Sequence, residues 1–217
     1  MPTPPPPHPR FPVHTPPFKS GRGCSHRPGM ANRMLTLGFL RPPPGDILEN
    51  RLTAAVSPHG ICHAELVFEN GVAFSIIQEE EVASLRQRTL SNPRYETVTL
   101  SVPAAEYHAC LSFCKTAHNA RLTFDSFGMY LCTVHPGCMQ RSSLELGKTF
   151  CSKIITEALS HAGAAEVEGL NPSATTPSSL YAAVRASPRR MCHSVRIGSH
   201  PLKLSCVRSV LTQNVMK

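Results

Sequence analysis

Two short apolar runs on either side of the dipeptide Asn70-Gly71 limit the folds open to this chain more than any other feature of its sequence. Residues 61–68 and 72–77 each have the length of a β-strand. An Asn-Gly pair between two such runs is the strongest short-range signal for a β-hairpin with a two-residue turn. The chain is therefore expected to contain an antiparallel sheet.

Apolar periodicity and turn residues predict the remaining elements. Alternating apolar residues predict strands at 34–40 and 94–102, and helical spacing predicts a helix from Pro103 to about His118. Further expectations are a helical or irregular stretch at 46–55, a short extended piece at 121–125 followed by a loop, a helix from Cys151 to Ala162 ending at Gly163, a short helix capped by Ser178 or Ser179 that runs to Val184, and strands at 194–197 and 202–207. This order predicts an α+β fold in which a small antiparallel sheet packs on helices.

Charge is distributed unevenly along the chain. The first 45 residues carry six Lys or Arg and no acid, residues 185–217 carry seven and no acid, and all 14 acids lie between Asp46 and Glu168. The first 33 residues are also Pro-rich, so a disordered basic tail is predicted ahead of one domain at 34–217. Basic ends could touch an anionic surface weakly. The stripe of Lys and Arg interleaved with aromatics that specific nucleic-acid recognition needs is missing from the sequence.

The cysteine content and the lack of a long apolar segment bear on the compartment. No stretch approaches the roughly 20 apolar residues of a membrane span, and prolines interrupt the N-terminus where a signal peptide would have its apolar core. Nine cysteines, an odd number, without secretory targeting favour reduced thiols in the cytoplasm or the nucleus.

Cys151 and His63 are the residues best suited to covalent chemistry. Cys151 is expected at a helix N-terminus, where the dipole lowers the pKa of a thiol, and a facing strand histidine could take its proton. A third polar group should orient the imidazole. With a two-residue turn, Gln78 would lie opposite His63 and Ser75 one diagonal away, whereas Glu65 shares the strand face of His63. These three candidates stay open, and so does the interpretation that His63 and Cys151 only pack in a core.

A second group of candidate ligands is Cys132-x-x-His135-x-x-Cys138, with Cys110 and Cys114 on the preceding helix. Thiolate and imidazole ligands at two-residue gaps suit zinc, although structural zinc sites usually pair Cys-x-x-Cys knuckles. Cys110 and Cys114 lie one helical turn apart on an apolar face, so core packing explains them. No metal site and no cofactor is therefore predicted, and a zinc-stabilised basic adaptor is the lesser alternative.

Four short motifs occur in order along the chain. They are Gly45-Asp46-Ile47, His63-Ala64-Glu65-Leu66-Val67-Phe68 with Ser75, Phe124-Asp125-Ser126-Phe127-Gly128, and Phe150-Cys151-Ser152. Together they resemble the circularly permuted NlpC-type papain-like superfamily, which includes the lecithin:retinol acyltransferase group, YiiX-like amidases and esterases, and proteins of phages and large DNA viruses. The resemblance covers about residues 45–181 and implies a permuted papain-like fold.

The resemblance also implies roles for individual residues. Cys151 would be the nucleophile, His63 the base, and a polar residue on the next strand the third member. The acyltransferase branch has a second histidine twelve residues after the first, where this chain has Ser75, so Ser75 is the first choice and Glu65 the second. The family often has Glu after Cys-Ser, where this chain has Lys153, which opposes the helix dipole but could stabilise a thiolate.

These residues predict a thiol-dependent hydrolase or acyltransferase that acts on an amide or ester bond of a peptide, amide or lipid substrate. The backbone N–H of Cys151 is expected to stabilise the oxyanion, with Lys148 or Thr149 as a second donor. The alternative is a catalytically inactive papain-like interaction module, which Ser75 and Lys153 motivate as departures from the family pattern. A viral source would add the host cell or the virion to the expected locations.

Overall fold

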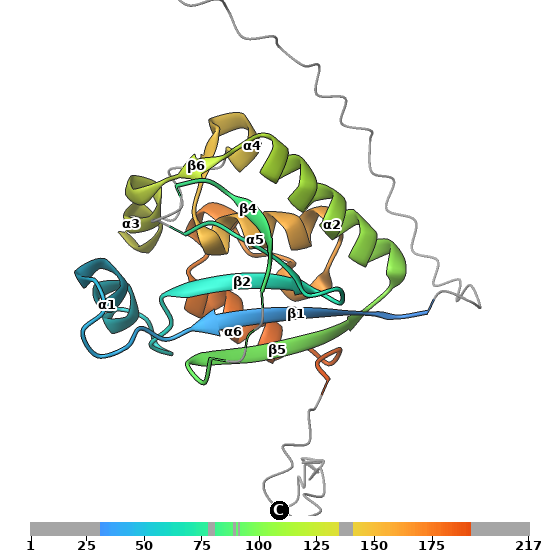
Figure 1. Cartoon of the computed structure of the whole chain (residues 1–217), viewed down its shortest axis with the longest axis horizontal. Coiled ribbons are helices and arrows are strands. Elements are labelled where there is room, and N and C mark those ends of the chain that lie inside the picture. The colour runs from blue at the N-terminus through green and yellow to red at the C-terminus, as the bar shows by residue number, and fades with distance from the viewer. Residues whose placement is uncertain (1–30, 78–80, 89, 91, 135–140, 192–217) are drawn as a thin grey trace, which may run out of the picture. The chain divides into compact units, whose positions relative to one another are not determined.

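The computed structural model describes residues 31–77, 81–88, 90, 92–134 and 141–191. In this part of the chain, five strands form one antiparallel sheet in the order β4-β3-β2-β1-β5 (Figure 1). The strands are β1 (Arg33–Leu40), β2 (His63–Phe68), β3 (Val72–Ser75), β4 (Ser84–Gln87) and β5 (Tyr95–Val102). The strands expected at 34–40 and 94–102 and the hairpin are confirmed, whereas β4 is not predicted from the sequence.

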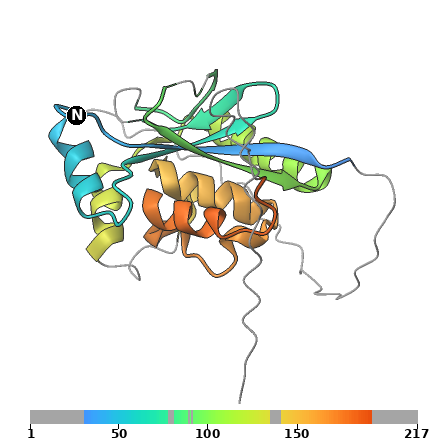
Figure 2. The same cartoon turned by 90° about the horizontal axis from the view of Figure 1, so that it is seen from below.

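Helices cover the sheet, as the predicted α+β class requires. They are α1 (Leu48–Ala55), α2 (Ala104–Asn119), α3 (Ser126–Val134), α4 (Ser143–Leu146), α5 (Cys151–His161) and α6 (Pro177–Arg185), with short 3-10 turns at Ala165–Val167 and Pro172–Ala174. A small parallel pair joins β6 (Thr123–Phe124) to β7 (Lys148–Thr149). Helices α5 and α6 lie along one face of the sheet (Figure 2), and α5 contacts β2, β3, α2 and α6.

Strand β1 lies inside the sheet because it pairs with β2 on one side and with β5 on the other. Leu35, Leu37 and Phe39 alternate along β1 and are buried, which is the period-two pattern of a strand with one core face. Ile154 and Ala158 of α5 belong to the same hydrophobic cluster. The start of α5, which carries Cys151, is thereby fixed against the strand that begins with the candidate histidine.

The β2–β3 hairpin turns through three residues, so the predicted two-residue turn is wrong. The backbone N–H of Gly71 donates to the carbonyl of Phe68 at 2.9 Å, and Val67 pairs with Ala73. Gly71 has a φ of +76°, which glycine adopts without a steric penalty. The backbone N–H of Val72 donates to the side-chain oxygen of Asn70, so the Asn-Gly pair does form the turn, with one residue more than expected.

This longer turn decides which face Ser75 occupies. A change of register by one residue moves every side chain of a strand to the other face. Leu66 pairs with Phe74, and the same register sets Ser75 across from Glu65. Ser75 therefore shares a face with Glu65 and His63. Gln78, the residue predicted opposite His63, lies outside the described residues.

Helix α3 stands where a loop is expected after Asp125. The backbone N–H of Gly128 donates to Oδ1 of Asp125 at 2.9 Å, so this carboxylate caps the helix N-terminus. Helix α6 begins two or three residues earlier than expected, because Thr176 and Ser179 form a capping box. The motif at 124–128 is thus, at least in part, a helix start.

The strands predicted at 194–197 and 202–207, and nearly all of the predicted tail at 1–33, lie outside the described residues. Among the helices that the structure does describe, none combines the length and the apolar character needed to cross a bilayer.

Candidate active site

Cys151 is the first residue of α5, and its side chain is buried. Burial raises the pKa of its thiol, but the charge and the hydrogen bond of His63 lower it more, so the pKa lies below the ordinary value. The backbone N–H groups of Ala64 and Ser152 also donate to the sulfur and favour the thiolate. The nucleophile expected from the sequence is therefore in contact with the expected base.

His63 opens β2 and faces both Cys151 and a carboxylate. Burial lowers the pKa of its imidazole, but the charge and hydrogen bond of Cys151, followed by those of Glu65, raise the pKa to about 9. Opposite shifts in a contacting thiol and imidazole favour the thiolate–imidazolium form of this pair over its neutral form.

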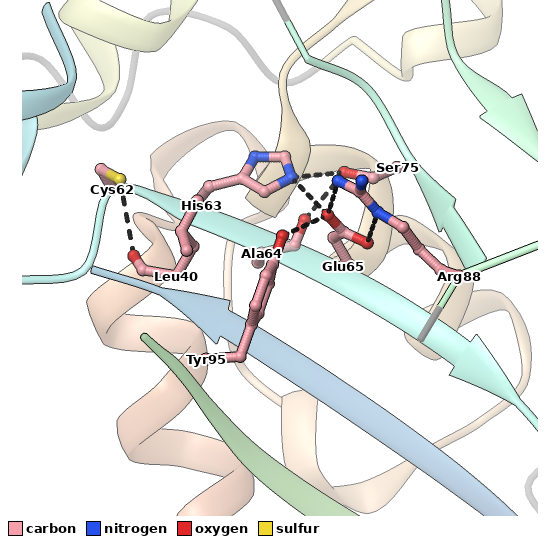
Figure 3. A network of polar contacts seen from close by, with 8 residues as sticks. All are labelled: Leu40, Cys62, His63, Ala64, Glu65, Ser75, Arg88 and Tyr95. Carbon is pink, nitrogen blue, oxygen red and sulfur yellow. Dashed lines mark hydrogen bonds and ion pairs between the residues drawn. The ribbon is translucent and has the colours of Figure 1, made fainter. Parts of the chain in front are cut away.

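Both third-member candidates contact the same ring nitrogen of His63 (Figure 3). Nε2 lies 3.2 Å from Oγ of Ser75 and 3.5 Å from Oε1 of Glu65. The Ser75 hydroxyl donates its own hydrogen to the carbonyl of Ala64 at 2.8 Å, so its oxygen is free to accept from Nε2–H. This arrangement leaves Nδ1 as the ring nitrogen for Cys151. Ser75 supplies the nearer acceptor, and Glu65 supplies the charge.

The Glu65 carboxylate stays ionised although it is fully buried. Arg88 donates to both of its oxygens, at 3.1 and 2.7 Å, and the hydroxyl of Tyr95 donates to Oε1 at 2.6 Å (Figure 3). Burial raises the pKa of Glu65, but hydrogen bonds from His63, Arg88 and Tyr95 hold it far below the ordinary range. The sequence analysis does not identify Arg88 or Tyr95.

One sequence signal for Tyr95 exists in β1. Gly38 pairs with Glu65 on one side and with Thr97 on the other. A Cβ at Gly38 would lie 3.2 Å from the Tyr95 ring and 2.7 Å from Leu90. A glycine inside an apolar strand marks a close approach of this kind, and here it lets Tyr95 reach across β1 to Glu65.

The groups that the sequence analysis expects to stabilise an oxyanion or the thiolate differ in their surroundings. The backbone N–H of Cys151 is at the first position of α5, where no helical carbonyl takes it. Lys153 is buried and donates to the carbonyl of Arg141 at 3.0 Å, and it is not among the groups that shift the pKa of Cys151. Lys148 pairs with Asp125 at 3.4 Å, and the Thr149 hydroxyl accepts from Ser143. A second oxyanion donor from Lys148 or Thr149 stays a prediction.

Cys151 lies where two cavities meet. The larger, of about 600 Å³, is lined mainly by apolar side chains from α1, α3 and the segment before α6. The smaller, of about 330 Å³, has a mixed lining in which His63, Asp46 and Arg94 lie beside apolar side chains such as Ile76 and Phe124. Asp46 belongs to the motif at 45–47, so that motif also contributes to the site.

The other thiols near Cys151 have unreactive surroundings. Burial and the nearby Cys151 raise the pKa of Cys62 to about 12 and that of Cys132 to about 11.

Cys110 and Cys114 are buried in the core, as the packing interpretation expects. His135 and Cys138 lie outside the described residues, and among the residues with assigned positions no group of three or more His, Cys, Asp or Glu could hold a metal ion.

The structure thus brings Cys151, His63, Ser75 and Glu65 into one cluster and adds Arg88 and Tyr95 to it. Comparisons of the chain with family models, with curated proteins and with solved structures find no match.

Proposed function

We propose that this protein is a thiol-dependent hydrolase or acyltransferase of the permuted papain-like class, with Cys151 as nucleophile and His63 as base and acid. The observation that carries the proposal is the contact between the two side chains, with the pKa of the thiol lowered and that of the imidazole raised. A buried thiolate beside an imidazolium at a cavity is the arrangement that covalent acyl transfer requires.

The reaction follows from this ion pair. The Cys151 thiolate attacks the carbonyl carbon of an ester or amide, a C–S bond forms, and the carbonyl electrons move to oxygen. The backbone N–H of Cys151 stabilises this oxyanion. When the intermediate collapses, the bond to the leaving group breaks and the His63 imidazolium protonates that group. His63 then takes a proton from water or another acceptor, whose oxygen or nitrogen displaces the thiolate and releases the acyl group.

Ser75 and Glu65 support the imidazole in different ways. The Ser75 oxygen accepts from Nε2–H and fixes the ring orientation, while the buried Glu65 charge stabilises the imidazolium. Arg88 and Tyr95 keep that carboxylate ionised and immobile. The inactive alternative is motivated by two departures from the family pattern, Ser75 and Lys153, and both are compatible with activity. The Ser75 oxygen can accept a hydrogen bond from His63, and the Lys153 ammonium donates to the carbonyl of Arg141.

The test is acylation of Cys151 by p-nitrophenyl acetate. We expect a stoichiometric burst of p-nitrophenolate and one acetyl group on the peptide that contains Cys151, in the wild type but not in Cys151→Ser. His63→Ala should slow the burst at least a hundredfold, since general acid–base catalysis contributes about 10²–10⁴. Cys114→Ala, at a buried core thiol that lines neither cavity, is the control and should keep the burst. Acetylation of Cys151 at the rate of a free thiol would reject the proposal.

A further inference from the structure

Cys151 borders both cavities, so a substrate whose carbonyl reaches the thiolate must extend into each of them. Cys62 and Met129 also line both, which makes these three residues the boundary between the two spaces. The acyl part of the substrate and its leaving group lie on opposite sides of the attacked carbonyl. The chemistry of each cavity therefore indicates which half it takes.

The larger cavity suits an apolar group. Among its described lining residues there is no Asp, Glu, Lys, Arg or His, and the walls include Leu52, Val56, Ile61, Met129 and Phe150. A volume of about 600 Å³ is in the range of small-ligand sites. Leu52 and Val56 are 50% and 71% exposed, so a ligand that covers them removes apolar surface from water.

Three of the hydroxyl groups around this cavity are hydrogen-bonded within the protein itself. Ser152 donates to the carbonyl of Thr175 at 2.6 Å, and Ser57 is hydrogen-bonded to Ser178. The Thr176 hydroxyl accepts from the backbone of Ser179 in the cap of α6. A peptide chain in this space would bring N–H and C=O groups that need partners, and burying such groups without partners is costly. A hydrocarbon chain makes no such demand.

The smaller cavity differs from the larger one because charged and polar side chains share its walls with apolar ones. Asp46, Asn50, Arg94 and His63 contribute the polar groups, beside apolar residues such as Leu40 and Ile76. His63 must also lie on the side of the leaving group, because its imidazolium donates the proton that this group needs. The polar half of the substrate therefore fits here.

We infer that the larger cavity binds the acyl part of the substrate as an unbranched aliphatic chain of more than a few carbons, and that Leu52 of α1 helps to set the preferred chain length. This inference rests on the proposed acyl transfer at Cys151. The smaller cavity receives the polar leaving group or acceptor.

The test is a chain-length series of p-nitrophenyl esters, from acetyl to octanoyl, each kept below its micelle concentration. Rates of Cys151 acylation are divided by the rate of the same ester with free cysteine. About fourfold acceleration per added methylene is expected until the cavity is filled, which corresponds to about 0.8 kcal/mol per buried CH₂. The pentanoyl ester should also exceed its length-matched polar counterpart, the N-acetylglycyl ester.

Two variants on the same helix provide a matched comparison. Leu52→Ala removes apolar atoms from the wall of the larger cavity. Leu48→Ala changes an exposed leucine one turn earlier in α1, which does not line the cavity. Leu52→Ala should lower the ratio of octanoyl to acetyl rates about tenfold, which corresponds to about 1.4 kcal/mol, because the chain loses part of the apolar surface that covers it. Leu48→Ala should leave that ratio unchanged.

The outcomes separate the two proposals. Equal rates along the series, or a faster N-acetylglycyl ester, would overturn the acyl-chain inference while Cys151 still reacts, so the proposed function would stand. If no ester acylates Cys151 faster than free cysteine, the proposed function itself fails. Offering the octanoyl group as a monomeric ester and as micelles of dioctanoyl phosphatidylcholine shows whether the chain comes from a soluble donor or from a lipid surface.

Discussion

Three thiols lie around the larger cavity, and their surroundings give them different reactivity. The pKa of Cys151 is lowered, whereas that of Cys62 is about 12 and that of Cys132 about 11. Because only the thiolate reacts with iodoacetamide, we expect Cys151 to be alkylated selectively below the ordinary pKa of a free thiol, about 8.5, as measured by peptide mass spectrometry. His63→Ala should remove this selectivity. Alkylation of Cys62 or Cys132 before Cys151 would contradict the described ion pair.

Glu65 and Ser75 should differ in their effect on the His63 pKa. Glu65 raises that pKa by charge and hydrogen bond, and Ser75 is not among the groups that shift it. We expect NMR titration of His63 to give a clearly lower pKa in Glu65→Gln than the value of about 9 in the wild type. Ser75→Ala should keep the raised pKa and lose orientation, which would appear as roughly tenfold lower kcat/KM, the effect of one net hydrogen bond.

Glu65→Gln also leaves the guanidinium of Arg88 without its carboxylate, but the Arg88 side chain is 36% exposed and water solvates it in part, so the loss of stability should be smaller than for a fully buried pair. Tyr95→Phe provides a milder test because it removes one hydrogen bond to Glu65 and keeps the charge. Its His63 pKa should stay close to that of the wild type. A fall as large as that of Glu65→Gln would show that the Tyr95 hydroxyl, and not the carboxylate charge, maintains the imidazolium.

The members of the cluster differ in how far the sequence predicts them. Cys151 follows from its position at a helix start, and Glu65 from the alternation of side chains along the strand of His63. The prediction of Ser75 depends on the family resemblance, because the hairpin register predicted from the sequence is wrong by one residue. Arg88 and Tyr95 escape prediction because they reach Glu65 from a segment beyond β4 and from a strand two places away. Contacts across an intervening strand leave no pattern at short sequence separation, apart from the glycine at position 38.

At the level of elements, Gly128 and Asp125 fix the start of α3. A Cβ at position 128 would lie 2.3 Å from Oδ2 of Asp125, so the cap requires glycine there. Gly128→Ala should destabilise the protein by about 1–3 kcal/mol, the usual range for an added methyl without space, measured by urea unfolding. In an Asp125→Ser background, which keeps a shorter capping group, the same change should cost less. If Gly128→Ala lowered the free energy of unfolding equally in both backgrounds, its effect would not come from a clash with the Asp125 carboxylate.

The structure confirms the elements expected from strong periodicity, which are β1, β5, α2 and α5, and it also confirms the hairpin of β2 and β3. The failures have local physical causes. The turn at Asn70-Gly71 takes three residues because Gly71 alone adopts a positive φ in it. Helix α3 is missed because Gly and Ser near its start indicate a loop when the capping role of Asp125 is not recognised. Strand β4 is short and only partly buried, so it lacks an apolar pattern.

At the scale of the whole molecule, Arg189 ties the end of the described chain to three separate parts of the fold. It donates to Glu106 at the start of α2 at 2.7 Å and is paired with Glu166, while its carbonyl accepts from Ser101 of β5. Arg189→Gln should lower the free energy of unfolding by about 1.5–3 kcal/mol, as expected for loss of a hydrogen-bonded charge. Arg190→Gln, a change at the neighbouring exposed arginine, is the control and should stay within about 0.5 kcal/mol of the wild type.

The proposed ion pair at the meeting point of the two cavities determines how the activity of the protein should respond to pH. Thiolate and imidazolium coexist from the lowered pKa of Cys151 up to the pKa of His63 at about 9. For an alkyl ester, whose leaving group needs a proton, kcat/KM should rise with pH as Cys151 ionises and fall as the pH passes about 9, because His63 then loses the proton that it donates. Alkylation of Cys151 by iodoacetamide needs the thiolate alone, so its rate should not fall above that pH. If both rates fell together, the loss would reflect unfolding; if both stayed level, protonated His63 would have no part in expelling the leaving group.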